Sequence, residues 1–196
     1  MTIHFSNIIT YNYFKSADYE RKVFVDGFLL QLALFLVTFK WYKKKSGLNF
    51  HQSIDQSAHF YLLGSSIDKN INGYILPFWN EVGDITINQE LLEQISSYNQ
   101  IVLGISSPKQ DYLAEILNEH SPEKSYYCLG AAVYTKPVIL SEWMLVTLGT
   151  MFVSNPKRTL KKMGTSLIPF FKAITFDRKR LIEFSTYLNT DDQQTF

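Results

Sequence analysis

Two places in the sequence put polar side chains where an apolar strand is expected to give way to a helix. At the first, Asp26 follows the apolar run 23–25 and precedes an apolar segment that begins at Phe28. At the second, the apolar run 101–105 is followed by Ser-Ser-Pro-Lys-Gln-Asp. A carboxylate can take a proton from a hydroxyl group, and the free N–H groups of a helix start favour an anion such as a diphosphate. This spacing predicts a pocket and leaves its reaction open.

The elements around the second place follow from its hydrophobic pattern. Residues 101–105 are apolar except for Gly104, which is typical of a strand buried on both faces. From residue 112 to residue 117 apolar side chains recur at helical spacing. Ser107 is a suitable N-cap and Pro108 suits the first helical position, so the stretch predicts a strand, a tight turn and a helix.

The rest of the chain repeats this alternation. Further strands are expected at 5–10, 23–25, 59–64, 74–79 and 126–132. Helices are expected from Phe28 to about Lys45 and, capped by Asn88, through Ile95. The pattern predicts an α/β, Rossmann-like fold with a largely parallel sheet and helices on both faces. We expect a core at residues 1–138 and a basic helical C-terminal appendage at residues 139–196.

Length and composition bound the class of protein. The 196 residues suit one domain that can bury a full core. The single cysteine, Cys128, excludes an internal disulfide and fits a reducing cytoplasm. No signal peptide is expected at residues 1–12. The most apolar segment, residues 28–39, is shorter than the ~20 residues needed to span a bilayer, so we expect a buried helix there.

Charge is unevenly distributed along the chain. Residues 155–180 hold eight basic side chains and one acidic side chain, although the whole chain carries a net charge of only +1. This asymmetry predicts an anionic partner for the C-terminal part. No nucleic-acid motif accompanies the basic segment, so we do not expect a nucleic-acid partner. The histidines, such as His51 and His59, show no spacing that suggests a metal site.

The segment Gly-Ile-Ser-Ser-Pro-Lys-Gln-Asp at residues 104–111 resembles the G-x-G-x-P-K-Q-E signature of the WecG/TagA/CpsF glycosyltransferases, which build bacterial surface polysaccharides. Other segments that resemble this family flank it in the same order. These are Thr-Tyr-Asn at 10–12, Asp-Gly at 26–27, the strand and glycine at 59–64, the glycine strand at 126–132, and Asn-Pro-Lys-Arg at 155–158.

The resemblance implies an enzyme that transfers a sugar, with inversion, from a UDP-sugar to a polyprenyl-diphosphate-linked acceptor. It would be a hexosyl- or N-acetylhexosaminyltransferase of capsule, exopolysaccharide or teichoic acid assembly, and it would need no metal or other cofactor. It would work in the cytoplasm, peripherally at the inner face of the cell membrane, with the basic appendage on the anionic surface. A homo-oligomer is left open.

The resemblance also implies roles for single residues. Asp26 would be the general base. Substrate would be bound by Thr10, Asn12, Gly104, Lys109, Gln110, Gly130 and Arg158. Glycines would let the nucleotide approach closely, and the arginine fork would hold the diphosphate.

Several departures from the family pattern support an alternative function. Asn49 and Tyr134 stand where relatives have carboxylates, an arginine expected before Arg158 is absent, and the interval between Asn12 and Asp26 is short. The alternative is a family member without catalysis that serves as a binding or scaffolding subunit of a polysaccharide-assembly complex. Structural roles also remain open: Asp26 as a helix N-cap, Thr10 in a polar turn, and the basic tail as a solvated helix.

Overall fold

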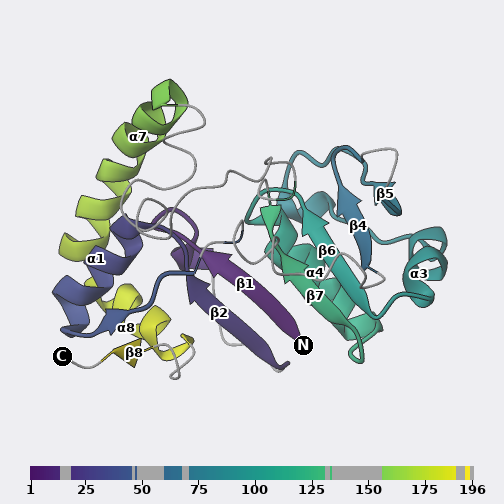
Figure 1. Cartoon of the computed structure of the whole chain (residues 1–196), viewed down its shortest axis with the longest axis horizontal. Coiled ribbons are helices and arrows are strands. Elements are labelled where there is room, and N and C mark those ends of the chain that lie inside the picture. Colours follow the sequence, from purple (N-terminus) through teal and green to yellow (C-terminus); the bar gives the residue numbers. More distant parts are fainter. Residues whose placement is uncertain are drawn as a thin grey trace.

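A six-stranded, all-parallel sheet forms the centre of the computed structural model (Figure 1). The structure describes residues 1–13, 19–45, 47, 60–67, 71–130, 133, 156–188 and 193–194, without the side chains of 156–163 and 193–194. The strand order is β2-β1-β7-β6-β4-β5. The strands are β1 (Thr2–Ser6), β2 (Arg21–Val25), β4 (Phe60–Gly64), β5 (Gly73–Ile75), β6 (Gln100–Gly104) and β7 (Ser125–Cys128). The predicted α/β, Rossmann-like class is confirmed.

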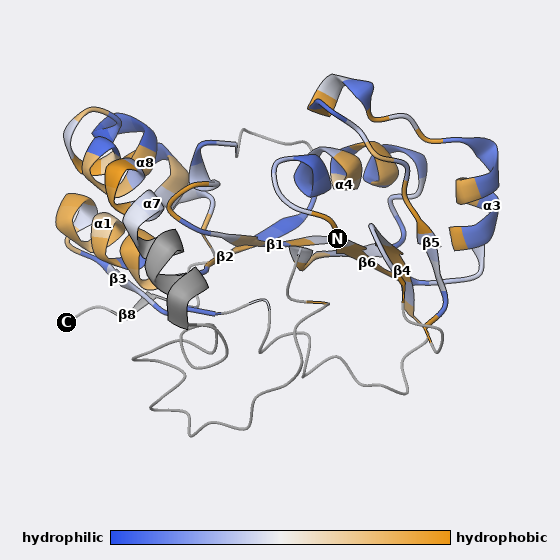
Figure 2. Cartoon of the chain, turned by 90° about the horizontal axis from the view of Figure 1, so that it is seen from above, coloured by the Kyte–Doolittle hydropathy of each residue, from blue (hydrophilic) through white to orange (hydrophobic). Residues whose placement is uncertain are grey.

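Helices flank this sheet. The described helices are α1 (Phe28–Thr38), α3 (Gln89–Ser96), α4 (Lys109–His120), α7 (Pro156–Thr175) and α8 (Arg178–Thr186), with short 3-10 turns η1 (Tyr11–Tyr13) and η2 (Val82–Asp84). As predicted, Asn88 caps α3, because its side chain accepts a hydrogen bond from the N–H of Leu91 at 2.9 Å. In Figure 2 the sheet is seen edge-on, with α4 over one face.

Residues of one continuous region fill the core under α3 and α4. Side chains of β4, β6 and β7 pack there against the apolar faces of both helices. The cluster includes Leu63, Leu91, Ile95, Ile101, Leu103, Leu113, Leu117 and Tyr126, each at most 2% exposed. Helices α3 and α4 therefore supply the cover for these three strands.

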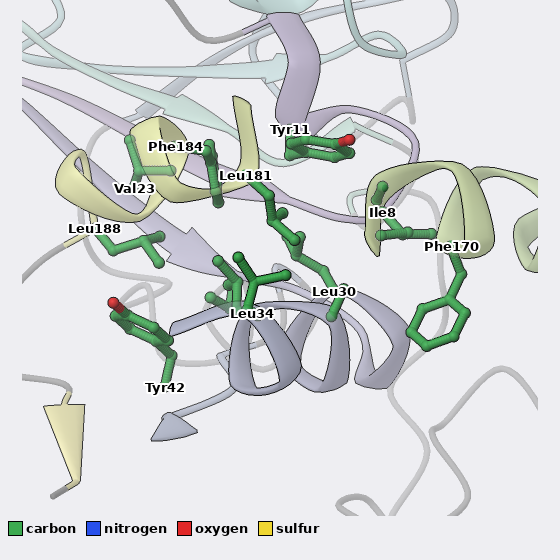
Figure 3. Packing of buried hydrophobic residues seen from close by; sticks show 14 residues of the cluster. Ile8, Tyr11, Val23, Leu30, Leu34, Tyr42, Phe170, Leu181, Phe184 and Leu188 are labelled. Carbon is green, nitrogen blue, oxygen red and sulfur yellow. The ribbon is translucent and has the colours of Figure 1, made fainter. Parts of the chain in front are cut away.

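The core at the other end of the sheet combines both ends of the chain (Figure 3). Leu30, Ala33 and Leu34 of α1 are fully buried against Leu181 and Phe184 of α8. The cluster also includes Val23 and Val25 of β2, Tyr11 of η1, and Phe170 and Ala173 of α7. The C-terminal helices thus cover the β2 end of the sheet. The expected boundary at residue 138 stays a prediction.

Strand β1 separates these two cores with a row of polar side chains. Thr2, His4 and Ser6 are buried and point to one face, whereas Ile3 and Phe5 point to the other, as the alternation of a strand requires. His4 is paired with Val23 of β2 on one side and with Cys128 of β7 on the other. Three buried polar residues in a central strand are costly unless each finds a partner.

The expected boundaries of two elements are wrong. Strand β1 ends at Ser6 and not at residue 10, because the Asn7 side chain accepts hydrogen bonds from the N–H groups of Ile9 and Thr10 and closes a turn. Helix α1 ends at Thr38, where Phe39 adopts a left-handed conformation (φ 57°) as the C-cap. The expected continuation to residue 45 instead forms β3 (Trp41–Tyr42), which pairs with β8 (Gln193–Gln194).

Two other elements are shorter than expected. Strand β5 ends at Ile75, although residues to 79 were predicted to be extended in it. Strand β7 ends at Cys128, and Gly130 beyond it has a φ of 55°, which is outside the range of a strand. Both strands therefore end earlier at the carboxyl edge of the sheet than their hydrophobic patterns predict.

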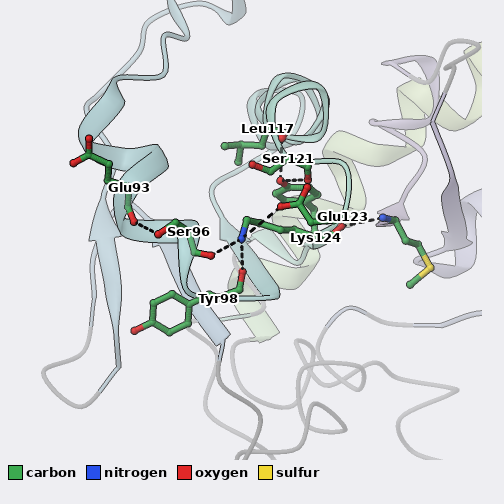
Figure 4. A network of polar contacts seen from close by, with 9 residues as sticks. Glu93, Ser96, Tyr98, Leu117, Ser121, Glu123 and Lys124 are labelled. Carbon is green, nitrogen blue, oxygen red and sulfur yellow. Dashed lines mark hydrogen bonds and ion pairs between the residues drawn. The ribbon is translucent and has the colours of Figure 1, made fainter.

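The amino edge of the sheet is closed by a buried lysine (Figure 4). The Nζ of Lys124 donates to the carbonyls of Ser96 and Tyr98 at 2.9 Å each, at the C-terminal end of α3. The amino group of Met1 donates to the Lys124 carbonyl at 3.0 Å. A cation near the last carbonyls of a helix complements the helix dipole, so this network has a structural explanation.

Among the described residues, no helix is both long enough and apolar enough to span a membrane.

Candidate active site at the carboxyl edge of the sheet

The start of α4 is held by side-chain contacts. Gln110 is 5% exposed, and its Nε2 donates to the Ser107 hydroxyl at 2.7 Å. Its Oε1 is buried and has no hydrogen-bond partner among the described residues. The helix begins at Lys109 with Pro108 as its N-cap, so the expected capping of the backbone by Ser107 is wrong. The Ser107 hydroxyl instead accepts from the Gln110 side chain.

Gly130 lies directly beside Gln110. A Cβ on Gly130 would lie 3.5 Å from Oε1 of Gln110 and 3.4 Å from the Ile105 carbonyl. The φ of 55° would also strain a side chain. Gly130, which was expected to let a nucleotide approach, is therefore also required by the local backbone conformation. A side chain at this position would press against the buried Oε1 of Gln110.

Lys109 is directed to the loop after β5. Its Nζ donates a hydrogen bond to the Trp79 carbonyl and lies 5.3 Å from the ring centre of Phe78, a cation–π contact. Lys109 thus stands at the same helix start as Gln110, but its charge is already used to hold the loop. Phe78 is 87% exposed and forms an open aromatic face at this edge.

Asp26 occupies the corresponding place between β2 and α1. The N-cap of α1 is Gly27 (φ 96°, ψ 140°), and no side chain caps the helix by a hydrogen bond. The interpretation of Asp26 as an N-cap is therefore wrong. The Asp26 N–H donates to the Ser6 carbonyl at 2.6 Å, which fixes the residue beside the end of β1. The Asp26 side chain is partly buried.

Thr10 and Asn12 line the turn that follows β1. The Thr10 hydroxyl accepts from the Asn7 N–H at 2.9 Å and lies 3.3 Å from the Ser6 hydroxyl. This contact supports the turn interpretation for Thr10. Asn12 is exposed, and its carbonyl accepts from the Arg180 guanidinium of α8 at 3.3 Å. Helix α8 therefore contacts the turn that holds Thr10 and Asn12.

The structure gathers most of the predicted residues at one edge. Because all six strands are parallel, the ends of β2, β1, β7 and β6 meet at the carboxyl edge, where open α/β sheets bind ligands. Asp26 and Thr10 lie near the end of β1. Gln110 and Gly130 lie near the ends of β6 and β7, and Gly104 is the last residue of β6. Three strand spacings, ~14 Å in all, separate β2 from β6.

Other predicted residues lie outside what the structure describes. Arg158 falls within α7, in the part whose side chains are not described. Asn49, His51, His59 and Tyr134 also lie outside the residues that the structure describes. Four basic residues of the segment 155–180 are described with their side chains, namely Lys172, Arg178, Lys179 and Arg180.

One group of polar residues was not predicted from the sequence. His4 Nδ1 and Asp111 Oδ1 are 2.7 Å apart, and the Cys128 thiol lies beside this pair. Burial, with a smaller contribution from Asp111, raises the pKa of the Cys128 thiol well above its usual value. The signal that could have revealed the group is the alternation of Thr2, His4 and Ser6 with Ile3 and Phe5 in β1.

No family model, no curated protein and no solved structure matches the chain. The fold and the site therefore define a parallel α/β protein with polar residues at the carboxyl edge of its sheet. Its activity has to be argued from the residues themselves.

Proposed function

We propose that the chain is a glycosyltransferase that moves a sugar from a UDP-sugar to a polyprenyl-diphosphate-linked acceptor with inversion. One observation carries this proposal. At the same sheet edge, an aspartate that does not cap its helix accompanies a buried amide, Gln110, whose Oε1 has no partner among the described residues. The resemblance of residues 104–111 to the Pro-Lys-Gln signature supports the assignment of donor binding to this place.

The start of α4 suits the donor. The first N–H groups of the helix favour an anion, and the diphosphate of a nucleotide sugar is such an anion. Gln110 Oε1 can accept a hydrogen bond from a hydroxyl or N–H group of the donor, which would relieve the cost of a buried, unpartnered acceptor. The exposed ring of Phe78 offers a surface on which a base or sugar ring can stack.

Asp26 suits the reacting hydroxyl. In the proposed step the Asp26 carboxylate takes the proton of the acceptor hydroxyl while the hydroxyl oxygen forms a bond to the anomeric carbon. The bond from that carbon to the diphosphate oxygen breaks, and UDP leaves with the electron pair. Attack opposite to the leaving group gives inversion. A positioned base of this kind contributes ~10²–10⁴-fold in rate.

Helix α7 suits attachment to an anionic membrane surface. Its apolar residues Leu167, Ile168 and Phe171 are 46%, 76% and 58% exposed, and Phe176 just after it is 85% exposed. Basic residues alternate with apolar ones in this segment of the sequence. Apolar side chains together with basic groups are what reversible binding to an anionic bilayer requires. We therefore place the protein at the cytoplasmic membrane surface as part of the proposal.

The experiment is a screen of UDP-sugars for binding to the full chain, followed by assay of UDP release with a short-chain lipid-diphosphate sugar as acceptor. The proposal predicts that one UDP-sugar binds and that UDP release depends on the acceptor. Binding without any release, across donors and acceptors, would favour the scaffolding alternative. Absence of binding by every UDP-sugar would overturn the proposed transferase.

A vesicle assay tests the membrane part separately. The full chain should sediment with anionic vesicles at low salt and be partly released at high salt, because the charge attraction is screened. Ile168→Ser with Phe171→Ser should sediment less, whereas Tyr112→Ser, an exposed aromatic change on α4, should behave as wild type. If the wild type ignores anionic vesicles at low salt, the membrane assignment fails.

A further inference from the structure

Three side chains with metal-binding donor atoms lie close together beside strand β1. They are His4 in the middle of β1, Cys128 at the end of β7 and Asp111 in the first turn of α4. Their donor atoms all lie within 4.8 Å of one another. His4 and Cys128 are direct neighbours in the parallel register, and α4 brings Asp111 over them. Elements far apart in the sequence thus converge on one point.

A hydrogen bond explains only part of this cluster. The 2.7 Å contact between His4 Nδ1 and Asp111 Oδ1 is a good hydrogen bond or ion pair. It leaves Oδ2 of Asp111, which is buried and has no hydrogen-bond partner among the described residues. Cys128, which is only 1% exposed and belongs to the core under α3 and α4, places its thiol against this pair. A buried carboxylate oxygen without a partner is costly, and a cation would remove that cost.

We propose that this cluster is a metal site that takes Zn²⁺, with the His4 imidazole, the Asp111 carboxylate and the Cys128 thiolate as its three protein ligands. Nitrogen, sulfur and carboxylate oxygen are the donors that zinc uses in proteins. Mg²⁺ and Ca²⁺ prefer oxygen donors alone, so a thiolate and an imidazole argue against them. In a tetrahedral site, three protein ligands leave one position for water.

The metal would have a positioning role. Asp111 is the residue after Gln110, and Cys128 lies two residues before Gly130. A metal that joins them to His4 would fix the start of α4, and with it the Gln110 side chain, against β1 and β7. This inference does not depend on the proposed transfer reaction, and the metal takes no part in the proposed chemistry.

Cobalt titration of the full chain tests the site directly. The protein, free of any affinity tag and stripped with a chelator, is titrated with Co²⁺ as a spectroscopic substitute for Zn²⁺. We expect one Co²⁺ per chain, the visible bands of tetrahedral cobalt and a near-ultraviolet thiolate-to-cobalt band. Because Cys128 is the single cysteine of the chain, a thiolate band can come from no other residue. Added Zn²⁺ should displace the cobalt and raise the melting temperature.

Variants separate the site from incidental binding. Cys128→Ser should lose the thiolate band. Asp111→Asn should weaken the affinity for Co²⁺ by at least ~10–100-fold, the loss that is typical when a residue that only supports a metal ligand is mutated. His120→Asn, which changes an exposed histidine at the end of α4, should bind cobalt as wild type does. The proposal is overturned if wild type shows no thiolate band. It is also overturned if Cys128→Ser binds Co²⁺ with unchanged affinity, since the ion would then lie elsewhere.

Discussion

The two strand-to-helix junctions at the carboxyl edge are built in different ways. At the junction of β6 and α4, side chains hold the turn: Gln110 bonds to Ser107, and Lys109 bonds to the Trp79 carbonyl. At the junction of β2 and α1, backbone groups hold it, through Gly27 at φ 96° and the Asp26 N–H on the Ser6 carbonyl. Under the proposed function, the first junction would position the donor, and Asp26 at the second junction would take the proton.

The cores beneath these two junctions differ in how far apart their residues lie in the sequence. Beneath α4 the buried residues come from one continuous region, from Tyr61 to Cys128. Beneath the β2–α1 junction, Leu181 and Phe184 of α8 pack against Leu30 and Leu34 of α1. The second junction therefore depends on contacts between the two ends of the chain, whereas the first depends on neighbours in sequence.

The largest expected effect is on turnover by Asp26→Asn. The change keeps the shape of the side chain but removes the proton acceptor, so transfer should fall ~10²–10⁴-fold. Thermal stability should change less than turnover does, because asparagine keeps the size and shape of the side chain and Asp26 is not the N-cap of α1. Rates of UDP release with acceptor and melting curves measure the two quantities. Wild-type-like turnover would exclude Asp26 as the general base. It would also contradict the different roles proposed for the two junctions.

Phe184→Ala should cost ~3–5 kcal/mol in the free energy of unfolding, because a fully buried ring is lost from the core between α1 and α8. The ring also contacts Tyr11 edge-on, with centres 5.9 Å apart. Urea unfolding measures the cost, and Ile182→Ala, at an exposed position of the same helix, is the control. A loss no larger than that of the control would show that α8 does not close the second core.

Gly27→Ala should cost ~1–3 kcal/mol, because φ 96° with ψ 140° suits glycine and strains other residues. Space is not the reason, since a Cβ would meet only the Asn7 Cβ at 3.9 Å. Gly83→Ala is the matched control: its Cβ would meet nothing within 4 Å, and its φ is not in the left-handed range. Equal stabilities of the two variants would contradict a junction held by the Gly27 backbone.

The smallest expected effect concerns the change of stability at alkaline pH. Burial raises the pKa of Tyr19 from 10.0 to about 12, with further contributions from Glu115 and Cys128. The unfolded phenol ionises first as pH rises, so this part of the stability is present below pH 10 and is lost between pH 10 and about 12.

Urea unfolding between pH 8 and 11 tests the alkaline effect. The free energy of unfolding should decline less steeply for Tyr19→Phe than for wild type. Tyr13→Phe, at an exposed position, should follow the wild-type decline. Identical declines for wild type and Tyr19→Phe would contradict the prediction.

The sequence predicts the fold better than it predicts the site. Apolar runs such as residues 101–105 and the helical spacing after Pro108 identify buried strands and helices, because burial imposes those patterns directly. Turns are harder to predict. Asn7 ends β1 with its side chain and Phe39 ends α1 in a left-handed conformation, and neither choice follows from hydrophobic periodicity. Side-chain pairs across the fold, such as His4 with Asp111, depend on strand register and cannot be read from local spacing.

The role of the predicted binding residues is decided by contacts that the sequence does not show. Thr10 and Lys109 carry suitable groups, but the structure uses the hydroxyl in a turn and the ammonium on the Trp79 carbonyl. Gln110 differs, because its Oε1 stays without a partner among the described residues. Only the folded chain separates these cases.

Titration calorimetry of the bound UDP-sugar tests the division of roles most directly, with wild type, Asp26→Asn and Gln110→Ala compared side by side. The account predicts that Asp26→Asn binds the donor about as tightly as wild type. Gln110→Ala should bind it ~5- to 10-fold or more weakly, because a hydrogen bond worth ~1 kcal/mol or more is lost. If Gln110→Ala binds the donor as wild type does while Asp26→Asn loses binding, the roles assigned to the two junctions are contradicted.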